Sequence, residues 1–227
     1  MNVAIIAAAG QGTRLGAGRA KQFLELAGTP IIIHTLRRFE QCVDIQEIVL
    51  VLPAQDAAGF LALTGKYELR KLSRVVPGGA TRAESVWRGL QAVRPATAEI
   101  IAVHDGVRPF VTPDEISRTV RAAQVSGAAI LTAQATDTIK EVENGRVTRT
   151  LARAQLRHAL TPQCFRYALL RRAYEQEVDR MADATDDSAL VEQLGATVTV
   201  VEGDQRNIKI TRPEDIALAE MILKSGV

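Results

Sequence analysis

Short runs of apolar residues, with few polar residues among them, recur along the 227-residue chain. A strand that is apolar on both faces is typical of a parallel sheet covered by helices, whereas a half-exposed strand alternates apolar and polar residues. The runs therefore predict buried strands. They are expected at residues 2–10, 46–52, 73–76, 99–104, 128–132 and 197–201.

Helical patterns with start signals lie between these runs. We expect Pro30 in the first turn of a helix, a position that proline favours. Thr81 with Glu84, and Thr112 with Glu115, have the spacing of a capping box. The predicted helices are residues 31–39, 82–93 and 113–125, a helix from residue 166, and residues 214–224. This alternation predicts the α/β class, with a Rossmann-like, mostly parallel sheet and helices on both faces.

One segment departs from this alternation. Two β-prone stretches flank Asn144-Gly145, and an Asn-Gly pair between such stretches is the strongest short signal for a hairpin. We expect this hairpin to project from the main body as an arm. The sequence thus predicts a single domain of residues 1–227 with an arm at about residues 135–153.

The composition excludes several classes of protein. The chain is 47% hydrophobic and 24% charged, as in ordinary globular proteins. A net charge of +2 and only 4% aromatic residues argue against a nucleic-acid partner, which needs a basic stripe and stacking aromatics. Cys42 and Cys164 are too few for a disulfide framework, and no apolar run is long enough for a membrane span. We expect a cytoplasmic protein with no membrane partner.

The loop after the first predicted strand indicates a phosphate site. Gly10 and Gly12 allow backbone N–H groups to surround an anion, and Arg14 and Lys21 can neutralise phosphate oxygens. The next glycine, Gly16, comes one residue too late for a dinucleotide-binding fingerprint. A solvated turn with two surface cations is the alternative.

Two further loops carry residues suited to a ligand. Gly78 and Gly79 precede a predicted helix whose first turn carries Ser85, so a flat ligand could approach closely there; a capped helix start is the alternative. Asp105 directly follows a buried strand. A carboxylate in that position suits Mg²⁺, which takes one or two carboxylates together with substrate phosphates. Alternatively, Asp105 forms a turn with Arg108 as its structural partner.

Two residues near the remaining strand ends need an interpretation. We interpret His104 as a structural histidine rather than a general base. Lys209 is flanked by isoleucines, which predicts strand alternation with its side chain facing opposite to theirs. If that face borders the ligand cleft, Lys209 is a third cation for the phosphates; otherwise it is a surface lysine.

Together these loops resemble the 2-C-methyl-D-erythritol 4-phosphate cytidylyltransferase family of the non-mevalonate isoprenoid pathway. The glycine–arginine loop alone marks only the wider class of sugar-phosphate nucleotidyltransferases, whereas residues 159–163 and 207–209 narrow it to this family. The matching motifs lie at residues 8–14, 21–22, 78–85, 104–109, 137–138, 158–163, 185–186 and 207–215.

The resemblance implies an enzyme that transfers CMP from CTP to 2-C-methyl-D-erythritol 4-phosphate, with Mg²⁺ as cofactor, bound near Asp105. Stabilisation of charge at the α-phosphate is implied for Arg14, Lys21 and Lys209. Nucleotide binding is implied for Ala8, Ala9, Gly10, Gly12, Gly79, Ala80, Ser85 and Asp105. Contact with the acceptor is implied for Arg108, Thr138, Arg153, Thr161, Thr185 and Asp186. In this family the arm crosses to the other subunit, so Thr138 and Arg153 would serve the neighbouring site of a homodimer.

The chain departs from the family pattern at two positions, and three alternatives stay open. Ala20 replaces a common proline, which leaves the backbone φ angle freer, and Arg206 stands where an acidic residue is common, so we assign Arg206 no role. One alternative is a cytidylyltransferase for another polyol phosphate, such as ribitol 5-phosphate. The others are a nicotinamide-dependent reductase, which the late glycine disfavours, and a regulatory nucleotide-binding module without catalysis.

Overall fold

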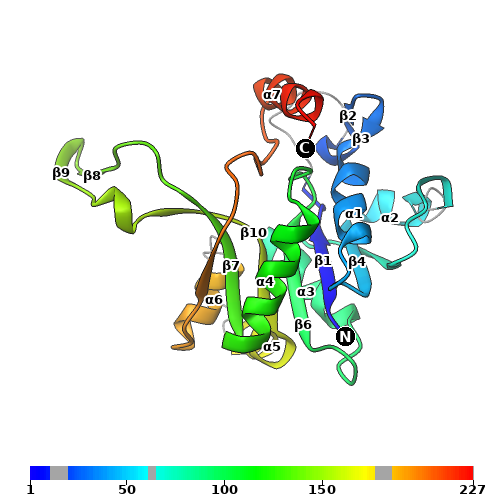
Figure 1. The fold of residues 1–227 in the computed structure, drawn as a ribbon. Helices are drawn as coiled ribbons and strands as arrows, with labels where there is room; N and C mark the ends of the chain where they lie inside the picture. Colours follow the sequence, from blue (N-terminus) through cyan, green and yellow to red (C-terminus); the bar gives the residue numbers. More distant parts are fainter. Residues whose placement is uncertain (11–19, 61–64, 177–185, 227) are drawn as a thin grey trace.

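The computed structural model describes residues 1–10, 20–60, 65–176 and 186–226. A seven-stranded sheet in the order β11-β7-β10-β6-β1-β4-β5 forms its centre (Figure 1). Every neighbouring pair is parallel except those that β10 makes with β6 and β7, so the predicted mostly parallel sheet is confirmed. The strands are β1 (Val3–Ala7), β4 (Glu47–Leu52), β5 (Leu72–Pro77), β6 (Ile100–Asp105), β7 (Ala128–Gln134), β10 (Arg157–Arg166) and β11 (Thr199–Glu202).

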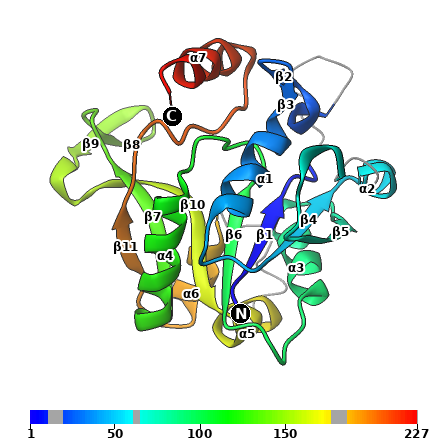
Figure 2. The ribbon, with the colours of Figure 1, turned by 45° about the vertical axis from the view of Figure 1, so that its right-hand side comes forward.

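Helices cover both faces of the sheet (Figure 2). Along β1 the side chains alternate: Ile6 packs in one core cluster with residues of α1, α2 and α4, and Ile5 packs in the other with residues of α3, α5 and α6. Because both faces are buried, the inner strands β1, β4 and β6 are apolar at nearly every position, as the sequence predicts. The helices are α1 (Ile31–Gln41), α2 (Ala54–Phe60), α3 (Arg82–Ala92), α4 (Pro113–Ser126), α5 (Tyr167–Gln176) and α6 (Asp187–Gln193).

The last helix, α7 (Pro213–Lys224), packs away from the sheet. Its Ala219 and Ile222 join a third cluster with Leu26 of the small ribbon β2 (Glu25–Leu26) and β3 (Thr29–Pro30). Pro30 pairs with Glu25 in this ribbon and is therefore the N-cap residue of α1, so its predicted place in the first turn is wrong by one position. In the described part of the chain, no helix combines the length and the apolar character that crossing a membrane requires.

The two predicted capping boxes differ. At the start of α4, Thr112 Oγ1 accepts from the Glu115 N–H group at 3.1 Å, and Glu115 Oε2 accepts from the Thr112 N–H group at 2.8 Å. At the start of α3, Thr81 Oγ1 caps the Glu84 N–H group at 3.1 Å, but the Glu84 carboxylate accepts from Ala80 instead of Thr81. The second box is thus only half formed, because the carboxylate reaches into the turn before the helix.

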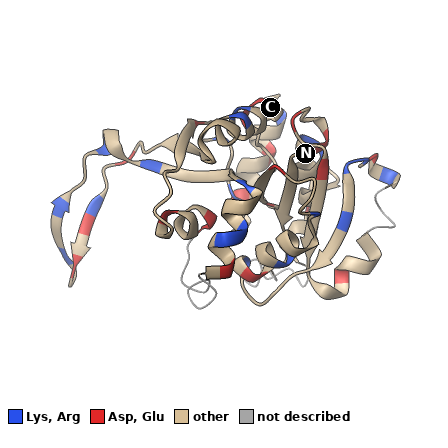
Figure 3. Cartoon of the chain, turned by 90° about the horizontal axis from the view of Figure 1, so that it is seen from below, with Lys and Arg blue, Asp and Glu red and all other residues tan. Residues whose placement is uncertain are grey.

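The predicted arm is present. It consists of β8 (Lys140–Glu143) and β9 (Arg146–Thr150), whose residues are all exposed, and it extends away from the sheet with charges of both signs along it (Figure 3). Asn144 and Gly145 have φ angles of 49° and 76°. Two consecutive residues with positive φ are what a tight hairpin turn requires, and Asn-Gly supplies them with little strain.

Several elements are missing from the sequence-based prediction, above all β10. This strand enters the middle of the sheet in the antiparallel sense, between β6 and β7. Its first three residues are exposed, and its register against β7 shifts between Ala159 and Gln163. Because the strand is neither uniformly apolar nor regular, its sequence lacks the pattern that marks the other strands. The short elements α2, α6, β2 and β3 are likewise unpredicted.

Candidate active site

A pocket of about 160 Å³ lies at the carboxyl ends of β1 and β6, beside the turn that follows β5. Sheets of this kind bind ligands at this edge, where loops lead from strands into helices. We call it the β1–β6 pocket. Its lining residues are Ala7, Ala8, Ala9, Gly10, Lys21, Gln22, Gly79, Ala80, Thr81, Arg82, Ser85, Asp105, Val107 and Lys209.

The pocket brings together many of the residues predicted to bind nucleotide or to act in catalysis. Lys21, in the short 3-10 helix η2 (Lys21–Phe23), and Lys209, close to the other end of the chain, both line it. The predicted residues Ala8, Ala9, Gly10, Gly79, Ala80, Ser85 and Asp105 line it as well. Gly12, Arg14 and Thr185 lie outside the described residues.

Asp105 lies among three cations. Its carboxylate Oδ1 is 3.0 Å from Arg82 Nε, and Oδ2 is 2.9 Å from Lys209 Nζ and 3.4 Å from Arg108 Nε. Burial alone would raise the pKa of Asp105, but the attraction of Arg82, Lys209 and Arg108 holds the pKa far below its ordinary value. This carboxylate is therefore ionised at any physiological pH.

The backbone around Lys209 is not the strand that the sequence predicts. Residues 207–210 have no strand pairing, so the expectation of strand alternation is wrong. The side chains nevertheless face opposite ways: Ile208 and Ile210 pack in the cluster beneath α7, and Lys209 reaches Asp105 with its own side chain 38% exposed. Anchoring by the two isoleucines thus gives Lys209 its direction without a strand.

Close approach of two turns shapes the part of the pocket that Ala9, Gly79 and Ser85 line. A Cβ atom at Gly78 would lie 2.1 Å from the Cβ of Ala9, so only glycine allows the turn after β5 to lie against the loop after β1. Ser85 Oγ accepts from the Gly79 N–H group at 3.1 Å and donates to Thr81 O at 2.8 Å. These bonds fix the hydroxyl and the turn in one arrangement.

His104 and Thr161 hold together the end of β6, which carries Asp105, and the loop that follows with Arg108. His104 Nε2 is 3.1 Å from the Arg108 carbonyl, which can only accept, so Nε2 carries the proton. Thr161 Oγ1 then donates to His104 Nδ1 at 2.9 Å and accepts from the Asp105 N–H group at 3.3 Å. Burial lowers the pKa of His104 to about 4, and both ring nitrogens are engaged. The interpretation of His104 as structural fits this geometry.

The other predicted acceptor residues fall into two groups. Arg108 lies beside the pocket, where Nη1 donates to the Asn207 carbonyl at 2.7 Å, and Asp186 caps α6 by accepting from the Ala189 N–H group at 3.0 Å. Thr138 and Arg153 belong instead to the arm segment and do not line the β1–β6 pocket of their own chain. The structure does not bring this second group to the pocket.

A charged link between two distant segments at the site has no signal in the sequence. Arg82 Nη2 lies 2.8 Å from Oδ2 of Asp187, so this guanidinium joins Asp187 to Asp105. The hydroxyl of Tyr174 donates to the other oxygen of Asp187, and Gln163 Oε1 accepts from its backbone N–H group at 3.1 Å. Arg82 and Asp187 are 105 residues apart, and no local motif relates them.

The carboxylate of Asp105 suits a divalent cation that takes few of its ligands from the protein. In the described part of the chain, no group of three or more His, Cys, Asp or Glu side chains could hold a metal ion by itself. A carboxylate offers about four lone-pair positions, and Asp105 uses three of them on cations, which leaves one on Oδ1. A Mg²⁺ ion that takes one carboxylate and several phosphate oxygens is compatible with this arrangement.

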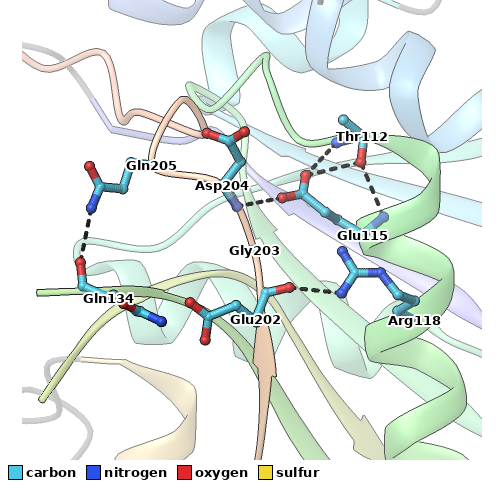
Figure 4. A pocket seen from close by; sticks show the side chains of 8 residues that line it. All are labelled: Thr112, Glu115, Arg118, Gln134, Glu202, Gly203, Asp204 and Gln205. Atoms are coloured by element: carbon cyan, nitrogen blue, oxygen red, sulfur yellow. Dashed lines mark hydrogen bonds between the residues drawn. The ribbon is translucent and has the colours of Figure 1, made fainter. Parts of the chain in front are cut away.

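A larger, more open hollow of about 640 Å³ lies between α4, the end of β7 and the segment after β11 (Figure 4). The residues that line it bond mainly to one another: Glu115 Oε1 accepts from the Asp204 N–H group at 2.8 Å, and Arg118 Nη1 donates to Glu202 O at 2.7 Å. None of the predicted site residues lines this hollow. The hydrogen bonds serve to tie the start of α4 to the edge strand.

Comparisons with known proteins agree on one family. The family model described as "IspD: 2-C-methyl-D-erythritol 4-phosphate cytidylyltransferase" matches residues 2–225. A 2-C-methyl-D-erythritol 4-phosphate cytidylyltransferase from Bacillus cytotoxicus is 44% identical over 223 residues, which cover 98% of each chain.

Solved structures give the same result for the fold. The 4-diphosphocytidyl-2C-methyl-D-erythritol synthase of Anaerococcus prevotii superposes with a TM-score of 0.87 at 33% identity, covering 99% of this chain and 98% of that one. The 2-C-methyl-D-erythritol 4-phosphate cytidylyltransferase of Thermus thermophilus superposes with a TM-score of 0.77 at 35% identity, covering 98% of each chain.

Proposed function

This chain belongs to the IspD family of 2-C-methyl-D-erythritol 4-phosphate cytidylyltransferases, and we propose that the β1–β6 pocket is its active site. The protein is a nucleotidyltransferase that transfers CMP from CTP to 2-C-methyl-D-erythritol 4-phosphate, giving 4-diphosphocytidyl-2-C-methyl-D-erythritol and pyrophosphate. One observation supports the placement above all others: Lys21, Asp105 and Lys209 come from distant parts of the sequence and line a single pocket.

CTP would lie with its base beside Gly79, Ala80 and Ser85 and its phosphates beside Lys21 and Lys209, all of which line the pocket. Small side chains and backbone groups suit a flat cytosine ring. The two lysines favour an anion. Together with Ala8, Ala9 and Gly10, these residues would define the nucleotide site.

The reaction would depend on position and charge. A phosphate oxygen of the acceptor attacks the α-phosphorus of CTP, the new P–O bond forms, and pyrophosphate leaves with the electrons of the broken P–O bond. Lys21 and Lys209 would stabilise the negative charge that builds up on the α-phosphate oxygens, together with Arg14. The acceptor is already an anion, so no strong general base is required, in keeping with the buried and fully engaged His104.

Asp105 would release Lys209 to the nucleotide without becoming unpaired. Removing one partner from a buried ion pair is strongly destabilising, because it leaves a buried charge uncompensated. If Lys209 moves to a phosphate, Arg82 and Arg108 still hold both oxygens of Asp105. The same carboxylate would hold Mg²⁺ through Oδ1, and the ion would neutralise part of the polyphosphate charge when bound.

We propose that the acceptor site is shared between two copies of the chain. Arg108, Thr161, Thr185 and Asp186 would come from one subunit, and Thr138 and Arg153 from the arm of its partner. The arm supports this assignment: Val142 and Val147 pair on it and are 58% and 61% exposed, and an isolated two-stranded hairpin is at best marginally stable in water. We further propose that this single-domain protein works in the cytoplasm, where the free thiols of Cys42 and Cys164 would stay reduced.

A pyrophosphate-release assay tests the proposed function. CTP should give pyrophosphate only when 2-C-methyl-D-erythritol 4-phosphate is present, UTP and ATP should give far less, and removal of Mg²⁺ with a chelator should abolish release. Ribitol 5-phosphate serves as the control acceptor. Equal turnover with ribitol 5-phosphate would contradict the assigned acceptor, and release from CTP alone would contradict transfer.

A further inference from the structure

One side chain in the β1–β6 pocket is buried with no hydrogen-bond partner in the part of the chain that the structure describes. Gln22 follows Lys21 in η2, is 1% exposed and lines the pocket. Among the described residues, neither Nε2 nor Oε1 of Gln22 has a hydrogen-bond partner. The amide can donate two hydrogen bonds and accept two, so its whole hydrogen-bonding capacity is unused.

A second glutamine shows how the same side chain is satisfied elsewhere in this chain. Gln163 is also 1% exposed, but its Nε2 donates to Asp186 Oδ2 at 2.8 Å. Its Oε1 accepts from the N–H groups of Asp187 and Ser188 at 3.1 and 3.0 Å. Buried amides in native proteins are nearly always hydrogen-bonded in this way. We therefore interpret a buried amide with no hydrogen bond as one whose partner is a ligand that binds later.

We propose that Gln22 is a further nucleotide-contacting residue, whose Nε2–H group donates to an oxygen of the CTP polyphosphate. The inference rests on the proposed function of the pocket. The position of Gln22 favours contact with the polyphosphate over contact with the base. Gln22 directly follows Lys21, whereas the base is assigned to the turn at Gly79 and Ser85. Oε1 accepts from a water or hydroxyl group that arrives with the nucleotide.

This role differs from that of the neighbouring lysines. An amide donates a directed hydrogen bond and adds no charge. It therefore orients a phosphate oxygen without adding electrostatic affinity for the pyrophosphate that must leave. The ligand-free protein carries the cost of the unpaired amide, and the bound nucleotide removes it. Binding sites commonly trade stability for function in this way.

The variant Gln22→Met tests the proposal, because methionine keeps the volume and removes both polar atoms. Replacing an unpaired buried amide by an apolar group should leave the melting temperature of the ligand-free protein unchanged or higher. Calorimetric titration should show CTP and CDP binding at least fivefold more weakly, with cytidine binding unaffected. Gln22→Leu, which differs in shape, should give the same pattern.

Two control variants make the result specific. Gln163→Met should lower the melting temperature, because it leaves Asp186 and two backbone N–H groups without partners. Gln91→Met, at an exposed position of α3, should change neither the melting temperature nor CTP binding.

Three results would overturn the proposal. They are a lower melting temperature for both ligand-free Gln22 variants, CTP affinity equal to that of the wild type, or equal losses of affinity for cytidine and CTP. The titrations need neither acceptor nor turnover. A wild-type protein that binds CTP but releases no pyrophosphate therefore contradicts the proposed function and leaves the Gln22 contact standing.

Discussion

Lys209 Nζ lies 2.9 Å from Oδ2 of Asp105, so an ammonium group from the C-terminal part of the chain is held at the end of the central strand β6. The Asp105 side chain is 8% exposed and that of Lys209 is 38% exposed. The carboxylate is thus fixed, while the lysine has solvent beside it. A pair of this kind keeps Lys209 at the pocket before a nucleotide arrives.

Loss of either pocket lysine should affect turnover more than nucleotide binding. If Lys21 and Lys209 stabilise charge that develops at the α-phosphate, Lys21→Ala or Lys209→Ala removes about 3 kcal/mol of transition-state stabilisation, roughly 100-fold in kcat. Steady-state kinetics and CTP titration would separate the two effects. Lys66→Ala, at an exposed lysine of the 3-10 helix η4 (Gly65–Tyr67), is the matched control. Near-normal turnover in both pocket variants would refute this assignment.

A mixture of two inactive variants tests the shared acceptor site. In a heterodimer of Lys209→Ala and Arg153→Ala chains, one site combines an intact Lys209 with an intact Arg153 from its partner. Random exchange of subunits should therefore restore about a quarter of the wild-type activity. The activity of each variant alone is the baseline. If the mixture is no more active than the variants alone, Arg153 does not act across the subunits.

The link between Arg82 and Asp187 should be important for stability. Arg82→Met leaves Asp187, which is 1% exposed, with an uncompensated charge. Breaking a buried pair in this way should lower the free energy of unfolding by about 3 kcal/mol, measured by urea denaturation. Arg171→Met breaks an exposed pair with Glu175 and should have a much smaller effect on the free energy of unfolding. Equal losses in the two variants would show that the Arg82 link adds nothing.

Acidification should destabilise the protein through His104. Burial lowers the pKa of His104 from 6.5 to about 4, so between these values the unfolded chain binds a proton that the folded chain does not. Stability is therefore complete above pH 6.5 and falls as the pH drops towards 4, by ~1.4 kcal/mol per pH unit. Asp105 acts in the same direction at lower pH, because its pKa is also lowered.

Urea denaturation at several pH values would measure this slope. His104→Gln should flatten it between pH 6.5 and 4, whereas His158→Gln, at an exposed position, should leave it as in the wild type. An unchanged slope in His104→Gln would mean that other groups cause the acid sensitivity.

Much of the local structure could be predicted because its causes are local. The apolar run of β1, the capping box of Thr112 and Glu115, and the turn at Asn144-Gly145 depend on residues close together in the sequence. The pocket at the strand ends followed from the fold class and from the glycines and cations of three loops. Lys209 lines the pocket although no strand orients it, so its catalytic role stays a prediction and the strand alternation expected for it is wrong.

The sequence by itself determined the alternation of strands and helices, their caps and the family, because these depend on side-chain period, backbone preference and short motifs. Only the tertiary structure decided that β10 enters the sheet antiparallel, that Arg82 joins Asp105 to Asp187, and that Gln22 is buried with no hydrogen-bond partner among the described residues. These features depend on which distant segments the sheet order places side by side. A hydrogen bond made or missed between such segments has no signature in the residues next to it along the chain.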